Sequence, residues 1–338
     1  MIEWIWLTKI FKLVLVIQVG GWTVDNSEYM TDDYNRPVTN LRISVTKNCD
    51  LNCFYCHEEG QTTDKREMTV NEIERISRIA KDLNIRKIKL TGGEPLVRPD
   101  IIAIIEKISP YMKDTSLTTN GVKLSGLAKK LNSAGLDRVN ISLDTLVPEK
   151  YKTITGKNNL KDVKKGIEEA IESELYPIKL NSLIMKGKND DEIWDLIEYA
   201  SHHDVILQLI ELETDREGTS EDWFKEHYYD LKPVEKELRK KAENTKERRM
   251  HRRKKYYFEY KGGEAEVEVV RPMHNTKFCM GCTRLRMTSD GQLKTCLLTN
   301  ELIDIIGPMR KGASDKKLKE IFKEAVSLRK PYWQEKKT

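Results

Sequence analysis

Residues 41–56 read Leu41-Arg-Ile-Ser-Val-Thr-Lys-Asn-Cys49-Asp-Leu-Asn-Cys53-Phe-Tyr-Cys56, which joins an alternating β-branched run to three closely spaced cysteines. The alternation predicts a strand, so the C-x3-C-x2-C group lies on the loop at its carboxyl end, where barrel active sites gather. Three thiolates on one loop can hold three irons of a [4Fe–4S] cluster and leave the fourth iron open. A closed zinc site with His57 as the fourth ligand is the alternative.

Short β-branched runs alternate with amphipathic segments through the middle of the chain. The predicted strands are residues 41–46, 87–91, 115–119, 138–143, 178–185 and 205–212. The predicted helices are residues 69–83, 99–108, 125–134, 161–173 and 191–202. A capping-box pattern, Thr69 with Glu72, opens the first helix. These repeats predict an incomplete (βα)6 barrel of the TIM type, with an open doubly wound sheet as the structural alternative.

The sequence divides the chain into three parts. Residues 30–212 form the predicted barrel, and residues 213–338 form a C-terminal region that we expect to cover one face of it. Within that region eleven Lys or Arg and three Glu fall between 236 and 255, and we interpret this run as a solvated helix face. Residues 1–29 are apolar, but their uninterrupted apolar stretch is too short for a membrane span. We interpret them as upstream sequence read from a misassigned start.

Composition indicates a folded protein with a heavily charged surface. The 338 residues include 59 Lys or Arg and 54 Asp or Glu, so the net charge is only +5, and 38% of the residues are hydrophobic. Mixed charge with apolar residues throughout argues against a disordered chain. The six cysteines fall into two groups of three, and a chain of this length does not need a disulfide framework. We therefore expect two metal or iron–sulfur sites, kept reduced in the cytoplasm.

The second cysteine group is Cys279-Met-Gly-Cys282 followed by Cys296. Three thiolates again leave an iron open. Arg284 and Arg286 lie between the last two cysteines, and their i, i+2 spacing on a strand would place both guanidinium groups on one face. Such a pair suits the bidentate binding of phosphate oxygens.

The first cysteine group resembles the radical S-adenosylmethionine (SAM) superfamily, in which the open iron chelates SAM and electron transfer from the cluster yields a 5′-deoxyadenosyl radical. Two further motifs agree with it. Thr91-Gly-Gly-Glu-Pro95 ends the second predicted strand, and Asn140-Ile-Ser-Leu-Asp144 ends the fourth. The resemblance implies that Tyr55, Gly93 and Ser142 bind SAM.

Both cysteine groups together, with Arg-Leu-Arg between the last two cysteines, closely resemble the GTP 3′,8-cyclase family (molybdenum cofactor biosynthesis protein A), over about residues 36–330. The resemblance implies two [4Fe–4S] clusters, one on each triplet, with the first triplet catalytic. It implies that the radical removes the ribose 3′ hydrogen of GTP and that C3′ then attacks guanine C8. The product would be (8S)-3′,8-cyclo-7,8-dihydroguanosine 5′-triphosphate. The implied GTP-binding residues are Arg42, Lys89, Thr118, Lys179, Arg284, Leu285 and Arg286.

The resemblance also sets expectations for partners. We expect GTP, a reductant protein and a downstream pyranopterin synthase, with a homodimer left open, and we expect neither nucleic acid nor a membrane. Two departures stand out. Glu213 occupies a position where many members have a SAM-contacting Met, and the Pro331-Tyr-Trp ending resembles archaeal members rather than bacterial ones with a terminal glycine pair.

Two other functions remain open from the sequence. One is a different two-cluster radical SAM enzyme that modifies peptides, although such enzymes usually carry more cysteines in the C-terminal region. The other is a non-enzymatic metal protein that binds nucleic acid through residues 236–255, where a basic run would contact phosphates. Bound zinc without iron would exclude both enzyme hypotheses.

Overall fold

The computed structural model of the chain describes residues 29–57 and 66–334. The interpretation of residues 1–29 as a misassigned upstream segment therefore falls almost wholly outside the described residues. Among the residues described, no helix combines the length and apolar character needed to cross a bilayer.

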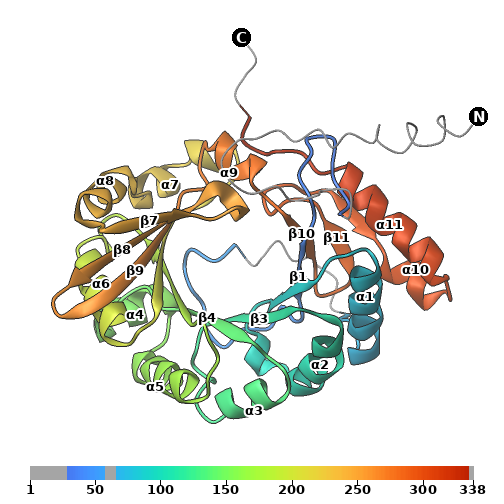
Figure 1. Ribbon diagram of the computed structural model, residues 1–338, viewed down its shortest axis with the longest axis horizontal. Helices are drawn as coiled ribbons and strands as arrows, with labels where there is room; N and C mark the ends of the chain where they lie inside the picture. Colours follow the sequence, from blue (N-terminus) through green and yellow to red (C-terminus); the bar gives the residue numbers. More distant parts are fainter. Residues whose placement is uncertain (1–28, 58–65, 335–338) are drawn as a thin grey trace, which may run out of the picture.

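Six parallel strands form the centre of the sheet, in chain order, as the sequence predicts. They are β1 (Asn40–Ser44), β2 (Lys87–Thr91), β3 (Asp114–Thr119), β4 (Arg138–Ser142), β5 (Lys179–Ile184) and β6 (Ile206–Glu211). The sheet curves around an open centre with the helices on its outside, so the predicted partial barrel is confirmed and the flat doubly wound alternative is wrong (Figure 1).

The connecting helices also follow the sequence pattern. They are α1 (Val70–Asp82), α2 (Ile101–Ile108), α3 (Ala128–Ser133), α5 (Leu160–Glu172) and α6 (Ile193–His202). The capping box of α1 is present in full, because Thr69 and Glu72 each bond the other's backbone N–H. A further helix, α4 (Pro148–Thr155), was not predicted; it is short and weakly amphipathic, with Pro148 at its first position.

The C-terminal region extends the sheet at both edges instead of forming a layer over one face. Beyond β6 lie β9 (Gly263–Val270), β8 (Lys254–Tyr260) and β7 (Asn244–Glu247), and beyond β1 lie β10 (Arg284–Met287), β11 (Gln292–Lys294) and β12 (Leu302–Asp304). Both β9 and β10 run parallel to their barrel neighbours. The expectation of a cover is therefore corrected: these strands continue the barrel wall, because their backbones complete the hydrogen bonding of β6 and β1.

Helices of the C-terminal region pack around this extended sheet. They are α7 (Asp222–His227), α8 (Lys232–Lys241), α9 (Thr276–Met280), α10 (Ile306–Arg310) and α11 (Asp315–Ser327). In Figure 1, α9 lies at the gap between the two edges of the sheet.

The basic run 236–255 is only partly a helix. It begins in α8, continues through β7 and a turn at Met250–Arg252, and ends in β8. The interpretation as a solvated helix face is thus right for α8 alone. The turn has left-handed backbone at His251 (φ 62°) and Arg252 (φ 51°), which sends neighbouring side chains in different directions.

Candidate active site

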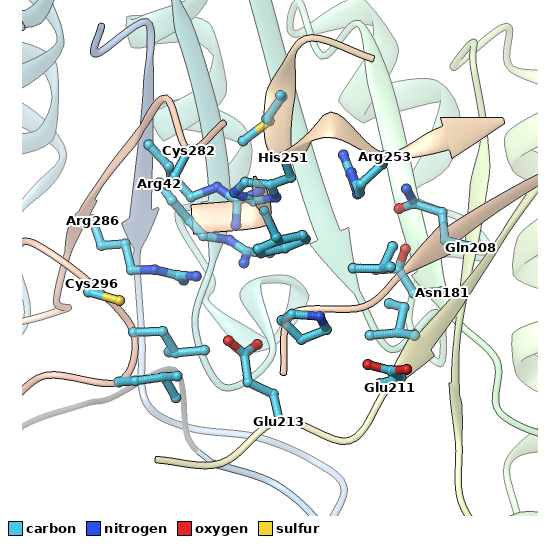
Figure 2. A pocket seen from close by; sticks show the side chains of 18 of the residues that line it. Arg42, Asn181, Gln208, Glu211, Glu213, His251, Arg253, Cys282, Arg286 and Cys296 are labelled. Atoms are coloured by element: carbon cyan, nitrogen blue, oxygen red, sulfur yellow. The ribbon is translucent and has the colours of Figure 1, made fainter. Parts of the chain in front are cut away.

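A pocket of about 350 Å³ occupies the centre of the barrel, and its wall includes side chains from β1 to β6 and from the C-terminal region. All three cysteines of the second triplet line it, as does Tyr55 from the loop of the first triplet. Figure 2 shows Arg42, Arg286, Cys282 and Cys296 on one side of the pocket.

The first cysteine loop packs directly on the turn after β2. A Cβ on Gly93 would lie 2.3 Å from the carbonyl oxygen of Asn48, so only glycine permits this approach. Glu94 secures the same turn by accepting hydrogen bonds from Leu96 N, Thr119 Oγ1 and Asn120 N. Gly93 itself does not line the pocket; it fixes the position of the loop that carries the thiols.

Tyr55 is held at the pocket by a buried carboxylate. Its hydroxyl donates to Asp144 Oδ2 at 2.6 Å, and Asp144 Oδ1 accepts from Leu183 N at 2.8 Å. Burial raises the pKa of Asp144 to about 6, although these hydrogen bonds oppose the shift. Ser142 lines the pocket two residues before Asp144, so two of the expected SAM-binding residues lie at the same end of the barrel.

Buried arginines surround the second cysteine loop. Arg36 Nη1 donates to the carbonyl oxygen of Cys279, and Arg329 Nη2 donates to that of Cys282. Both guanidinium groups pair with Asp32, at 2.8 Å and 3.2 Å. Burial would raise the pKa of Cys282, but Arg329 and Arg284 outweigh it and the pKa is lowered. This environment favours a thiolate.

Trp333 closes the pocket near the second cysteine loop. Its backbone N–H donates to Cys279 Sγ at 3.4 Å, and its ring lies 4.2 Å from that of His274. Its indole Nε1 is buried without a hydrogen-bond partner. Arg216 lies over the ring, 5.8 Å from its centre.

The six cysteines are all reduced thiols and form two candidate ligand groups of three. Within residues 29–57 and 66–334, no three His, Cys, Asp or Glu side chains come close enough to share one metal ion. A cluster places each thiolate on a different iron, so its cysteines can lie farther apart than the ligands of one ion. Each group of three cysteines could hold three irons of a cluster in this way.

A hydrogen-bonded polar network crosses the floor of the pocket. Lys89 Nζ donates to Asn140 Oδ1 at 2.8 Å, and Asn140 Nδ2 donates to Gln208 Oε1 at 3.2 Å. Gln208 in turn donates to Glu268, which also accepts from Lys179 Nζ, both at 2.7 Å. Burial lowers the pKa of Lys89, and neighbouring cations, Arg138 first, add to the effect. A bound anion would relieve this repulsion.

Most of the expected GTP-binding side chains meet in the pocket. Those that line it are Arg42, Lys89, Thr118, Lys179, Arg284 and Arg286. Leu285 differs from these residues: its side chain is fully buried in the hydrophobic core, so only its backbone could contact GTP. Because successive side chains of β10 alternate between faces, Arg284 and Arg286 face the pocket and Leu285 faces away. Glu213, at the expected Met position, also lines the pocket and points into it (Figure 2).

Several pocket residues were missed by the sequence analysis, chiefly Arg248, His251, Arg253 and Trp333. The first three belong to the basic run, where they resemble ordinary surface charges. A carboxylate within the β-branched run of β9, Glu268, was the available signal, since a buried strand rarely carries an unpaired charge.

Comparisons with known proteins agree with this geometry. Residues 43–200 match the radical SAM superfamily, and residues 205–335 match the family described as Molybdenum Cofactor Synthesis C. Among solved structures, SuiB of Streptococcus suis bound to its precursor peptide SuiA resembles the chain with a TM-score of 0.59. The identity is 15%, with 89% of this chain and 67% of that chain covered. At this identity the likeness concerns the fold alone.

Sequence relatives are much closer. The probable GTP 3′,8-cyclase of Pyrococcus horikoshii is 60% identical over 305 residues, covering 90% of this chain and 98% of the relative. That of Thermococcus kodakarensis is 59% identical over 304 residues, covering 89% and 99%. The chain therefore belongs to the GTP 3′,8-cyclase family of radical SAM proteins.

Proposed function

We propose that this chain converts GTP into (8S)-3′,8-cyclo-7,8-dihydroguanosine 5′-triphosphate, an early step of molybdenum cofactor biosynthesis. The observation that carries the proposal is the pocket itself. One cavity is lined by all three cysteines of the second group, by Tyr55 from the loop of the first group and by at least six cationic side chains, which suits a substrate with about four negative charges.

Each cysteine group has a distinct role in this proposal. Cys49, Cys53 and Cys56 would hold the cluster that cleaves SAM, while Cys279, Cys282 and Cys296 would hold a second cluster that could bind the guanine of GTP. When bound, the first cluster and SAM supply a 5′-deoxyadenosyl radical. The barrel wall then keeps water and oxygen from that radical.

The protein's own side chains would bind and orient the two substrates. Tyr55, fixed by Asp144, offers an aromatic face to the adenine of SAM, and Ser142 lies at the same end of the barrel. Gly93 would bind SAM through its backbone, since it has no side chain. Arg284 and Arg286 line the same pocket from β10 and would bind GTP together with the other cations that line it.

The wider setting follows from the same proposal. Residues 30–212 would form the SAM-cleaving part, and residues 213–338 would supply the second cluster and much of the GTP site. An enzyme of this kind needs a reductant protein for the first cluster and a downstream pyranopterin synthase for its product. We place it in the reducing cytoplasm, acting alone or as a homodimer.

Anaerobic reconstitution tests the proposal. After loading with iron and sulfide, the chain should hold about eight irons and, with SAM, dithionite and GTP, yield 5′-deoxyadenosine and the cyclised nucleotide. Cys53→Ala should abolish SAM cleavage. Arg284→Ala should keep SAM cleavage but weaken GTP binding by roughly 10- to 100-fold, the loss of one charged contact. Full cyclase activity in both variants would contradict the residue assignment.

A further inference from the structure

Glu268 is a fully buried carboxylate with three cations around it. Lys179 Nζ lies 2.7 Å from Oε2, Arg253 Nε lies 3.0 Å from Oε1, and Arg248 Nη1 lies 3.2 Å from Oε1. Gln208 Nε2 adds a hydrogen bond of 2.7 Å to Oε2. The five side chains come from β5, β6, β9 and the β7–β8 hairpin, so they meet only in the folded barrel.

This cluster forms part of the pocket wall. Lys179, Gln208, Arg248 and Arg253 all line the cavity, whereas Glu268 lies behind them with no exposed surface. Figure 2 shows Arg253 and Gln208 across the pocket from Arg286 and Cys296. The carboxylate thus touches each cation from behind.

The net positive charge of this cluster favours the binding of an anion. When Lys179 is protonated, three positive charges face one negative charge, which leaves a net charge of +2 at a buried position. Burial would raise the pKa of Glu268, but Arg253, Lys179 and Arg248 outweigh it and lower the pKa to about 2. Arg253 Nε is close to Glu268 but out of line for a hydrogen bond, so this buried donor is left without one. Uncompensated buried cations are costly unless a ligand pairs with them.

The hairpin turn places some of its side chains in the pocket and others outside it. Its left-handed residues, His251 and Arg252, let Arg248 and Arg253 face the pocket, while Arg252 remains outside, 3.4 Å from Glu247. His251 stacks on Phe278, with ring centres 3.9 Å apart, and this contact joins the turn to the helix of the second cysteine group.

We infer that Arg248 and Arg253 bind the polyphosphate chain of GTP beside Lys179, and that Glu268 is the positioning residue that holds all three cations in place. The inference rests on the proposed function and deepens it, since the resemblance supplies only Lys179 from this cluster. A guanidinium held by a fixed carboxylate keeps its remaining N–H donors directed at the cavity, which lowers the entropy lost when phosphate binds.

Matched charge removals on one hairpin test the binding role. Arg248→Gln and Arg253→Gln each remove a pocket cation, while the control Arg252→Gln removes an exposed one from the same turn. Titration calorimetry on the reconstituted enzyme should give roughly 10-fold or greater weakening of GTP binding for the first two. Binding of guanosine, which has no phosphates, should change little, and inorganic tripolyphosphate should compete with GTP less well than in the wild type. The control should match the wild type throughout.

These measurements distinguish failure of the proposed function from failure of the inference about Arg248 and Arg253. If the wild type binds no GTP, the proposed function fails. If it binds GTP but Arg248→Gln binds equally well, or if guanosine binding weakens as much as GTP binding, the inference alone is overturned. Arg248 is one-third exposed, so its substitution is the one least able to disturb folding.

Glu268→Gln tests the positioning role, because loss of the negative charge and loss of positioning would change GTP affinity in opposite directions. The change removes a negative charge from the site, so electrostatics alone would tighten GTP binding. Positioning requires the opposite: the KM for GTP rises while kcat stays near the wild-type value, because the cations are no longer held. Equal or tighter GTP binding would overturn this role for Glu268. Iron content and the thermal midpoint would verify that the variant folds.

Discussion

Lys179 shows how burial and charge compete at a single residue. Burial lowers the pKa of Lys179 to about 7; Glu268 opposes this, whereas Arg248 and Arg253 reinforce it. A bound triphosphate would bring negative charge beside the amine and so favour its protonated form. In the free site the Lys179 ammonium loses its proton as the pH rises through 7, whereas in the complex with GTP the ammonium stays protonated. GTP affinity should therefore fall as the pH rises above 7.

Lys179→Arg isolates this effect, because a guanidinium stays charged across the range. Between about pH 7 and about pH 9, the wild-type Kd for GTP should rise by up to tenfold per pH unit, the limit for one coupled proton. The arginine variant should show a flatter profile. Calorimetry in two buffers of different ionisation enthalpy would also detect proton uptake on binding by the wild type. Identical pH slopes in both proteins would exclude Lys179 as the titrating group.

Site residues could be predicted from the sequence where their spacing along the chain indicates a shared binding role. The cysteine groups and the Arg284–Arg286 pair could be found because their spacing alone places like side chains together. Arg248 and Arg253 could not, since their charges are ordinary for a surface and only the hairpin turn brings them into the barrel. Leu285 was included because the motif was carried over whole, but alternate side chains of a strand face opposite sides, so its side chain faces away from the pocket.

At the scale of elements, the strands and helices of the barrel could be predicted from local sequence signals. The strands at the two edges of the sheet could not, because they depend on long-range pairing. Strand β2 and the capping box of α1 agree with prediction because alternation and caps are local properties. Helix α4 was missed because eight residues with a weak apolar stripe resemble a loop. The pairing of β9 with β6 and of β10 with β1 joins segments far apart in the chain, and no local pattern encodes it.

The segment around Trp333 should protect the second cluster. Trp333 belongs to a small apolar cluster against which Cys279 packs, and the residue is only 7% exposed, so Trp333→Ala would open a path for water and oxygen. The alanine variant should lose iron faster than the wild type when exposed to air, with the loss confined to about half of the total iron. Trp333→Phe keeps most of the ring and serves as the control. Equal rates of iron loss in Trp333→Ala and the wild type would show that the ring does not shield the cluster.

Across the whole molecule, a set of cations lies at the amino ends of the barrel strands, and the first cysteine group lies at the carboxyl end. The cations Arg138, Lys179 and Arg284 are the first residues of their strands, whereas the first cysteine group follows the carboxyl end of β1. A nucleotide triphosphate would therefore lie with its phosphates toward these cations and its ribose toward SAM. The family relationship and this arrangement of charges both agree with a nucleoside triphosphate as the substrate.

Transfer of deuterium tests this arrangement most directly. The reconstituted enzyme would be supplied with SAM, dithionite and GTP carrying deuterium at the ribose 3′ position, and 5′-deoxyadenosine would be analysed by mass spectrometry. We predict one deuterium in the 5′-deoxyadenosine, and none when the label is at the 2′ position instead. Unlabelled 5′-deoxyadenosine from the 3′-labelled substrate, formed while GTP is consumed, would contradict the central claim that the pocket presents the 3′ carbon of GTP to the radical.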